Sequence, residues 1–203
     1  MINLKGFDLI LGSKSPYRFK LLQEAGYDPR ILSAEIDEKK FGDRENSEKL
    51  HEVPLEIAKA KRDAILKDIS PKRQKALLIT ADQISVHDTL ILEKPSSGDE
   101  IRRRLEVLMG SIRPLQFWNG LTVTNLWTGA SIEATDSSFT IVRKIPKEIL
   151  LKIIENEIFL TCASGVMIEH PLYSPYVIKT SGGFDTIIGL TISLFEKLAK
   201  ELL

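Results

Sequence analysis

The sequence predicts a mixed α/β or α+β fold, because short apolar runs typical of buried strands alternate with segments of helical periodicity. The run Ala76–Ala81 (ALLITA) is the clearest central strand. Leu115–Asn125 and Ala130–Val142 alternate between apolar and polar residues, which indicates a pair of antiparallel strands. A hydrophobic content of 43% in 203 residues is enough for a buried core. The length indicates one domain over residues 1–203, with or without two lobes.

The chain opens on an expected strand that turns sharply into a helix. Phe7–Leu11 is mostly apolar and too short for a helix, which is typical of a buried strand. Ser15 then takes the N-cap position and Pro16 the first helical position. Apolar residues at helical spacing continue to Ala25, and Gly26 ends this helix.

The other expected elements follow in chain order. They are a strand at Arg30–Ala34, a solvated loop at Lys39–Lys49, a helix from Pro54 to about Leu66, a basic turn at Ser70–Lys75, the strand Ala76–Ala81 ending at Asp82, a hairpin over Ile84–Ile91, a helix from Asp99 to Met109, the strands Leu115–Asn125 and Ala130–Val142, and helices at Pro146–Asn156 and Leu194–Leu203.

Composition limits the classes of function. The 28 basic residues balance 28 acidic ones, which argues against sequence-independent binding to nucleic acid. No apolar run reaches membrane-spanning length and residues 1–7 are too short for a signal peptide, so we expect a cytoplasmic enzyme. The single cysteine, Cys162, permits no internal disulfide and is expected to be a small buried side chain. His51, His87 and His170 lack metal-ligand spacing, so no zinc site is expected.

The turn from the first strand into the first helix is the strongest candidate for a binding site. A helix N-terminus presents free N–H groups and the positive end of the helix dipole, which suit a phosphate. Around it the sequence places two hydroxyls, a lysine, an arginine and an aromatic ring: Ser13, Ser15, Lys14, Arg18 and Tyr17. An ordinary strand–helix junction with a good cap is the alternative, since Ser-Pro caps are common.

Six motifs, taken in order, resemble those of the Maf family of nucleotide pyrophosphatases. They are Ser13–Arg18 (SKSPYR), Ala34–Glu38 (AEIDE), Ile57–Lys61 (IAKAK), Thr80–Gln83 (TADQ), Glu93–Pro95 (EKP) and Gly182–Leu190 (GGFDTIIGL). None is specific alone, but their order extends over nearly the whole chain. The resemblance implies a Maf/ITPase-like fold, with an elongated, twisted mixed sheet, helices in two lobes around a central cleft that holds the site, and a homodimer.

The resemblance also implies a reaction, the hydrolysis of a nucleoside triphosphate to its monophosphate and pyrophosphate. Arg18, Lys61 and Lys94 would place positive charge on the phosphates. Glu38 and Asp82 are hard oxygen ligands of the kind that Mg²⁺ or Mn²⁺ prefers. Asp82 also matches the family's proton acceptor for the attacking water.

The residues themselves support these roles unequally. Any single Lys or Glu would ordinarily be expected on a solvated face. Asp82 differs, because a carboxylate that ends a strongly apolar strand needs a partner or a function. Asp37, beside Glu38, is an alternative metal ligand.

Three positions resemble a branch of the family that acts on 7-methyl-GTP, rather than the better-known branch that acts on dTTP and UTP. They are Tyr17, Gln83 and Glu169. A carboxylate can accept from both the N1–H and the N2 amine of guanine, and a base made cationic by N7 methylation stacks well on an aromatic ring. Tyr17 could equally be a packing residue. Thr191 stands where the family usually has proline, and Ile112–Pro114 replaces a more usual Gly-x-Thr-His stretch; both departures concern specificity more than catalysis.

Two other functions stay open. One is the same reaction on dTTP, UTP or CTP, and the other is a catalytically weak nucleotide-binding regulator of cell division or stress signalling. The presence of Asp82 argues against the second, because a protein that only binds does not need it. His170 is expected to shape a loop beside the base pocket.

Overall fold

The computed structural model describes residues 1–69 and 74–203, so most of the basic turn expected at Ser70–Lys75 lies outside the described residues. The chain forms two compact units. Unit 1 consists of Met1–Gln83, Trp118–Ser137 and Gly183–Leu203. Unit 2 consists of Ile84–Phe117 and Ser138–Gly182.

The described residues contain a seven-stranded mixed sheet, which confirms the predicted fold class. Its order is β2-β1-β3-β5-β6-β7, and β4 pairs with β3. Strand β1 is parallel to β2 and β3, whereas β4 and β7 are antiparallel to β3 and β6. The strands are β1 Asp8–Leu11, β2 Arg30–Ile31, β3 Ala76–His87, β4 Leu90–Ile91, β5 Leu115–Asn125, β6 Ser131–Val142 and β7 Val177–Ser181.

The structure contains each of the longer helices that the sequence predicts, and one short helix, α5, that it does not predict. They are α1 Pro16–Glu24, α2 Val53–Asp68, α3 Gly98–Gly110, α4 Lys147–Glu155, α5 Phe184–Ile188 and α6 Ile192–Leu202. Among the residues that the structure describes there are also five short stretches of 3-10 helix, at Glu38–Lys40, Leu50–Glu52, Glu157–Thr161, Ala163–Gly165 and Ser174–Tyr176. The first of these begins just before the stretch expected as a solvated loop at Lys39–Lys49, whose residues are exposed or half-buried.

The prediction that the central strand ends at Asp82 is wrong, because β3 continues to His87. Its turn comes at Asp88, which has a left-handed φ of 57° and leads into β4. The polar residues after Ala81 suggested a strand end, yet all of them stay buried or half-buried. A strand can continue through polar residues because its backbone stays paired with its neighbours. The strand expected at Arg30–Ala34 is also shorter, and α5 and β7 had no predicted counterpart.

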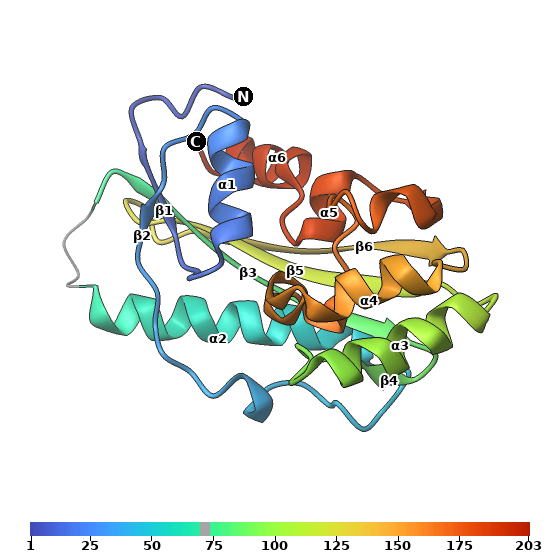
Figure 1. Cartoon of the computed structure of the whole chain (residues 1–203). Coiled ribbons are helices and arrows are strands. Elements are labelled where there is room, and N and C mark those ends of the chain that lie inside the picture. Colours follow the sequence, from blue (N-terminus) through green and yellow to red (C-terminus); the bar gives the residue numbers. More distant parts are fainter. Residues whose placement is uncertain (70–73) are drawn as a thin grey trace. The chain divides into compact units, whose positions relative to one another are not determined.

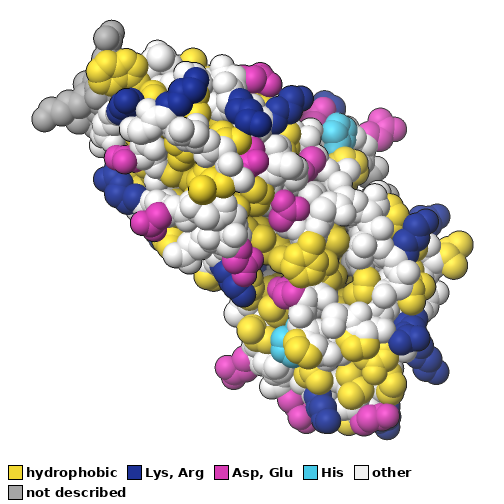
Figure 2. Space-filling model, turned by 90° about the horizontal axis from the view of Figure 1, so that it is seen from above, with side chains coloured by type: hydrophobic (Ala, Val, Ile, Leu, Met, Phe, Trp, Pro, Cys, Tyr) yellow, Lys and Arg dark blue, Asp and Glu magenta, His cyan; other side chains and the backbone are white. Residues whose placement is uncertain are grey.

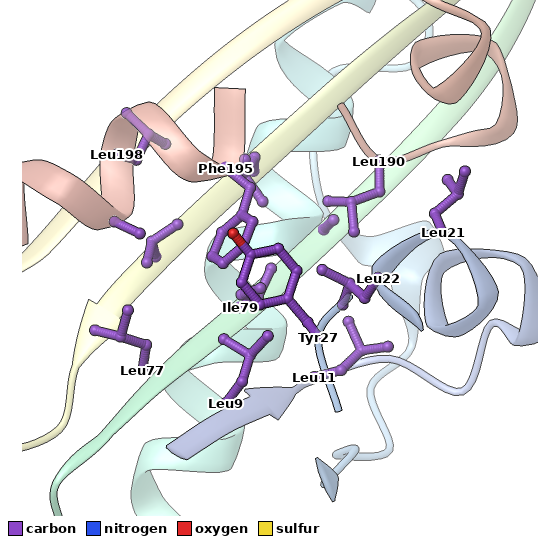
Figure 3. Packing of buried hydrophobic residues seen from close by; sticks show 14 residues of the cluster. Leu9, Leu11, Leu21, Leu22, Tyr27, Leu77, Ile79, Leu190, Phe195 and Leu198 are labelled. Carbon is purple, nitrogen blue, oxygen red and sulfur yellow. The ribbon is translucent and has the colours of Figure 1, made fainter. Parts of the chain in front are cut away.

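Unit 1 has its main core on one face of the sheet. Figure 1 shows α1 and α6 on one side of the strands and α2 on the other. In Figure 3 the side chains of β1, β3, α1 and α6 meet around Tyr27, whose ring packs edge-on against Phe195 at 5.3 Å. The opposite face packs Ile65 of α2 against Ile10 and Leu78. Each full burial of such a side chain stabilises the fold by about 1.5–3 kcal/mol.

Two glycines permit close approaches that place the elements of unit 1. A Cβ on Gly12 would lie 2.6 Å from Thr80 Cγ2 and 2.7 Å from Ile65 Cδ1. A Cβ on Gly120 would lie 2.2 Å from the backbone nitrogen of Leu55, in the first turn of α2. Any side chain at these positions would therefore push α2 away from the sheet.

Unit 2 packs α3 against α4, and a Cβ on Gly98 would lie 2.6 Å from the Ile154 carbonyl. Helix α3 buries Ile101, Leu105 and Leu108, as its periodicity predicts. On the face drawn in Figure 2, basic and acidic side chains are interspersed, in keeping with the balanced charge. A search of the described residues finds no helix long and apolar enough to cross a membrane.

Candidate active site

The turn between β1 and α1 has the predicted cap, and Arg18 of α1 forms hydrogen bonds to it. The Ser15 side chain accepts from the Arg18 N–H, and Pro16 opens the helix. The buried Ser13 Oγ accepts from Arg18 Nη1 at 3.1 Å and from Ser15 N at 3.2 Å. Because both bonds are accepted, the Ser13 hydroxyl proton is left for another acceptor. We call residues 13–18 the phosphate loop, after the ligand that the sequence predicts there.

Arg18 is buried, with 9% of its surface exposed. Its Nε donates to the Gly189 carbonyl at 2.9 Å. Burial lowers the pKa of Arg18, and the carboxylates of Asp82 and Glu38 oppose that shift. The guanidinium stays protonated even so, because arginine keeps its charge in proteins. A buried cation with donors to spare is suited to hold an anion.

The two other side chains predicted at the phosphate loop are placed differently. Lys14 is exposed and forms an ion pair with Glu35, which lowers the pKa of that carboxyl. The pair is on the surface, so it is easily exchanged for another partner. Tyr17 is half-buried on α1.

Lys61, Asp82 and Glu38 form the second part of the site. Lys61 Nζ lies 2.7 Å from Asp82 Oδ1 and 2.6 Å from Glu38 Oε1. The Asp82 side chain is 10% exposed and the Glu38 side chain 48%. Burial raises the pKa of Asp82, and the positive charges of Lys61 and Arg18 oppose that shift. A carboxyl with a raised pKa is suited to accept a proton.

Helix α2 holds Lys61 in place through a buried hydrogen bond one turn before it. Thr80 Oγ1, on the same face of β3 as Asp82, donates to the Ala58 carbonyl at 2.6 Å. The Thr80 hydroxyl also lies 2.8 Å from that of Thr122 on β5. This arrangement fixes the register between α2 and β3, and so the distance between Lys61 and Asp82.

The carboxylates of Glu38 and Asp82 fit a divalent cation. They converge on one ammonium group, so their oxygens already surround a positive charge. In the described part of the chain, no group of three His, Cys, Asp or Glu side chains could hold a metal alone. Mg²⁺ is commonly held by one or two carboxylates together with substrate phosphates, which matches this donor set. Asp37 instead caps the turn at Glu38–Lys40 by accepting from Lys39 N.

The side-chain amide of Gln83 forms hydrogen bonds to other residues of the protein. Its Nε2 lies 2.9 Å from Asn119 Oδ1, and 3.0 Å from each of the carbonyls of Thr186 and Ile187 in α5. Asn119 Nδ2 in turn donates to the Thr186 carbonyl at 2.9 Å. These bonds join β3 and β5 to the segment that carries Gly189.

Lys94 belongs to unit 2, where it is exposed in the loop between β4 and α3. The buried N–H of Ser164 anchors this loop by donating to the carbonyls of Leu92 and Glu93 at 3.1 and 3.2 Å. Ser164 has a left-handed φ of 61°, which is rare for a residue other than glycine. The turn before Lys94 is therefore held by a strained residue distant in sequence.

Glu169 also belongs to unit 2 and is exposed. The next residue fixes its loop: the His170 carbonyl accepts from Tyr173 N and Ser174 N, and His170 Nδ1 accepts from Leu172 N. The His170 ring packs edge-on against Phe159 at 4.7 Å. This agrees with the expectation that His170 shapes the loop.

Unit 1 thus contains nine of the predicted site residues and unit 2 contains the other two. Unit 1 holds Ser13, Lys14, Ser15, Tyr17, Arg18, Glu38, Lys61, Asp82 and Gln83, and unit 2 holds Lys94 and Glu169. Sequence reasoning missed Thr80, Asn119, Ser164 and Gly189. Two of these gave a signal, since Thr80 opens the motif Thr80–Gln83 and Gly189 lies in the closing Gly-rich motif, where its φ is 116°.

Comparison with known proteins agrees with these findings. A family model described as Maf-like protein matches residues 8–202. A 7-methyl-GTP pyrophosphatase of Dictyostelium discoideum is 31% identical over 95% of this chain and 96% of its own. A dTTP/UTP pyrophosphatase of Chlorobaculum tepidum is 32% identical over 96% of this chain and 94% of its own. A nucleoside triphosphate pyrophosphatase of Salinispora tropica is 28% identical over 96% of this chain and 83% of its own.

Relatives named for different bases are almost equally similar to this chain, so overall identity does not select a base. The family itself is clear, because the model spans nearly the whole chain and these relatives are matched over most of their own length. The chain therefore belongs to the Maf family of nucleoside triphosphate pyrophosphatases.

Proposed function

We propose that this protein hydrolyses the bond between the α and β phosphates of a nucleoside triphosphate, with 7-methyl-GTP as its preferred substrate. The observation that carries the reaction is the cluster in unit 1 formed by a buried arginine, a buried carboxylate of raised pKa and a lysine shared by two carboxylates. Phosphoryl transfer depends mainly on positioning and charge neutralisation, which this cluster is equipped to supply.

In the proposed reaction, Arg18 and the Ser13 hydroxyl bind phosphate oxygens at the N-terminus of α1. Asp82 accepts a proton from a water whose oxygen bonds to phosphorus. The phosphorus–oxygen bond of the α–β bridge then breaks, and its electron pair leaves with the departing phosphate group. Lys61 keeps Asp82 in place and balances its charge, and Lys94 is assigned to the phosphates.

A divalent cation, Mg²⁺ or Mn²⁺, is part of the proposal, with Glu38 and Asp82 as the protein ligands. When bound, it would neutralise phosphate charge and orient the phosphates. Asp37 is the weaker candidate, because its carboxylate caps a turn and forms an ion pair with Lys40 at 3.7 Å.

The preference for 7-methyl-GTP rests on Glu169 and Tyr17. An exposed carboxylate on a well-anchored loop can accept from both N1–H and the N2 amine of guanine. A base without these donors would leave the carboxylate unpaired, at a cost of about 1–3 kcal/mol, or roughly ten- to a hundredfold in catalytic efficiency. The tyrosine ring would favour the cationic, methylated base. The Dictyostelium relative is named for the same substrate.

The test is pyrophosphate release from 7-methyl-GTP, GTP, UTP, dTTP and CTP with Mg²⁺. We expect kcat/KM to be highest for 7-methyl-GTP, and Glu169→Gln to narrow its lead over UTP. Glu157→Gln is a matched control, since Glu157 is an exposed glutamate of the same unit outside the loop at Glu169. If the wild-type protein prefers UTP or dTTP, the proposed substrate is wrong and the proposed reaction still holds. Absence of turnover with every triphosphate would contradict the reaction as well.

A further inference from the structure

Arg18 is oriented by groups of the protein. Its Nε donates to the Gly189 carbonyl at 2.9 Å and its Nη1 to Ser13 Oγ at 3.1 Å. Because a guanidinium is planar, two bonds to different nitrogens fix the plane and hence the directions of the remaining donors. The position of the Gly189 carbonyl therefore decides how Arg18 faces the phosphate loop.

Gly189 follows α5, which has only five residues and is too short to be stable alone. The N–H groups of Gly189 and Leu190 both donate to the Asp185 carbonyl, at 3.0 and 3.1 Å. Helix α5 leaves the carbonyls of its last turn without partners inside the helix. What binds those carbonyls determines where α5 ends and where the Gly189 carbonyl lies.

The side-chain amides of Asn119 and Gln83 bind these carbonyls. Asn119 Nδ2 donates to Thr186 O at 2.9 Å, while Gln83 Nε2 lies 3.0 Å from both Thr186 O and Ile187 O. Asn119 Oδ1 also accepts from Gln83 at 2.9 Å, which leaves one amide orientation that satisfies both contacts. Asn119 is 5% exposed, so water cannot readily replace a lost bond.

The other side of α5 is held independently. The Asp185 carboxylate accepts from Thr186 N at 3.0 Å and from Ile192 N at 2.7 Å, and Thr191 donates to Asp136. Loss of Asn119 should therefore leave α5 attached to α6, and the linker between these helices attached to β6. Its carbonyl end would then be free to move.

We propose that Asn119 is a positioning residue for Arg18: with Gln83, it fixes the end of α5 so that the Gly189 carbonyl orients the guanidinium at the phosphate loop. This role rests on the proposed function, because Arg18 matters only if the loop binds a triphosphate. It also gives Gln83 a structural reason for its place beside Asp82, in addition to the predicted part in specificity.

The test is a double-mutant cycle on pyrophosphate release, using Asn119→Ala and Arg18→Ala. Alone, Asn119→Ala should lower kcat/KM about tenfold, the scale of one lost buried hydrogen bond. In the Arg18→Ala background the same change should cost less than about twofold, because residues that act through one another are not additive. Equal losses in both backgrounds would overturn the proposal, as would an unchanged kcat/KM in folded Asn119→Ala.

Asn125→Ala is the matched control. Asn125 is also buried on β5, where its Nδ2 donates to Leu202 O at 2.8 Å and its Oδ1 accepts from Trp127 N. Its loss should lower the melting temperature and leave kcat/KM unchanged. A loss of kcat/KM matching that of Asn119→Ala would mean that both asparagines act only through stability. If Asn119→Ala does not fold, the double-mutant cycle is measured with Asn119→Ser in its place.

A second measurement does not depend on turnover. The Arg18 Nε–H should exchange slowly with solvent in the free protein by ¹⁵N NMR, with its signal identified by its loss in Arg18→Lys. Asn119→Ala should speed this exchange, whereas Asn125→Ala should not. Equal exchange in wild type and Asn119→Ala would overturn the positioning role. If the Arg18 Nε–H exchanges as expected but no triphosphate is turned over, the proposed function is wrong and the positioning of Arg18 by Asn119 still holds.

Discussion

Asp82 is the residue on which most of the proposed chemistry depends. We expect Asp82→Asn to lower kcat at least about a hundredfold, since an amide cannot take the proton from water. Nucleotide binding should persist, because Arg18 and the phosphate loop are unchanged. Steady-state kinetics and calorimetric titration with a non-hydrolysed analogue measure the two effects. Asp63→Asn, on exposed α2 surface, is the control. Near-normal turnover of Asp82→Asn would remove Asp82 from the mechanism.

The raised pKa of Asp82 links activity and stability to pH in opposite directions. The folded protein binds this proton more tightly than the unfolded chain does. The group's contribution to the free energy of unfolding is therefore fully present below the unfolded pKa, about 4, and is lost as pH rises through the folded pKa. Turnover needs the unprotonated carboxylate, so kcat/KM should rise over the same interval.

Denaturant titrations and kinetics across pH, in wild type and Asp82→Asn, test this linkage. The substitution should remove this component of the pH dependence of stability. An acid limb of kcat/KM with its midpoint below about pH 4 would contradict the direction of the shift.

Glu38 and Asp37 are adjacent carboxylates with different contacts, which makes them a matched pair. Glu38→Gln should raise the Mg²⁺ concentration for half-maximal activity about tenfold or more, the scale of losing a charged ligand. Asp37→Asn should change it little, since Asp37 caps a turn. Metal titrations of both variants decide between them. If Asp37→Asn had the larger effect, Asp37 and not Glu38 would be the metal ligand.

At the scale of elements, the contact between α2 and β5 sets the distance between Lys61 and Asp82. Gly120→Ala should lower both the melting temperature and kcat/KM, because its Cβ would lie 2.2 Å from Leu55 N and displace α2. Gly110→Ala is the control, since no atom lies within 4 Å of its Cβ and its helical position favours alanine. Thermal melts and kinetics measure both. A neutral Gly120→Ala would mean that α2 shifts without moving Lys61.

The elements that the sequence predicts well are those with local signals. The cap at Ser15 and Pro16 and the periodicity of α3 are both present in the structure. The end of β3 was misplaced because the polar residues Asp82 and Gln83 separate the strand Ala76–Ala81 from the hairpin expected over Ile84–Ile91, whereas one strand runs through both and keeps these side chains buried or half-buried. Helix α5 was missed because side chains from distant strands support it.

The site follows the same rule. Charged residues within recognisable motifs, such as Arg18 and Asp82, can be identified from the sequence. Asn119 cannot, because a single asparagine in an apolar strand has no distinctive spacing. Its partners are 36 and 67 residues away in the chain, so only the fold brings them together.

At the scale of the molecule, three strands connect the two units. Strands β3, β5 and β6 each begin in one unit and end in the other, so neither unit is a continuous segment of chain. We expect expression of either unit alone to fail, because each needs strands that the chain shares with the other.

The balanced charge predicts a colloidal property. With 28 basic and 28 acidic residues and a pI near 6.9, self-repulsion is weakest near neutral pH. Solubility in precipitant should therefore pass through a minimum near pH 7 and rise on either side. Light scattering at fixed protein concentration measures it. A minimum more than about one pH unit away would indicate strongly shifted surface groups.

The ammonium of Lys61, between the carboxylates of Glu38 and Asp82, acts as a resident counter-ion. The two acids therefore do not depend on an outside ion to stay close together. A chelator should abolish turnover yet leave the melting temperature unchanged. Free Mg²⁺ should bind poorly, because Lys61 already occupies the attractive position, whereas Mg²⁺ that arrives on a triphosphate brings its own negative charge. In kinetics, the metal would then bind the protein together with the substrate and not before it.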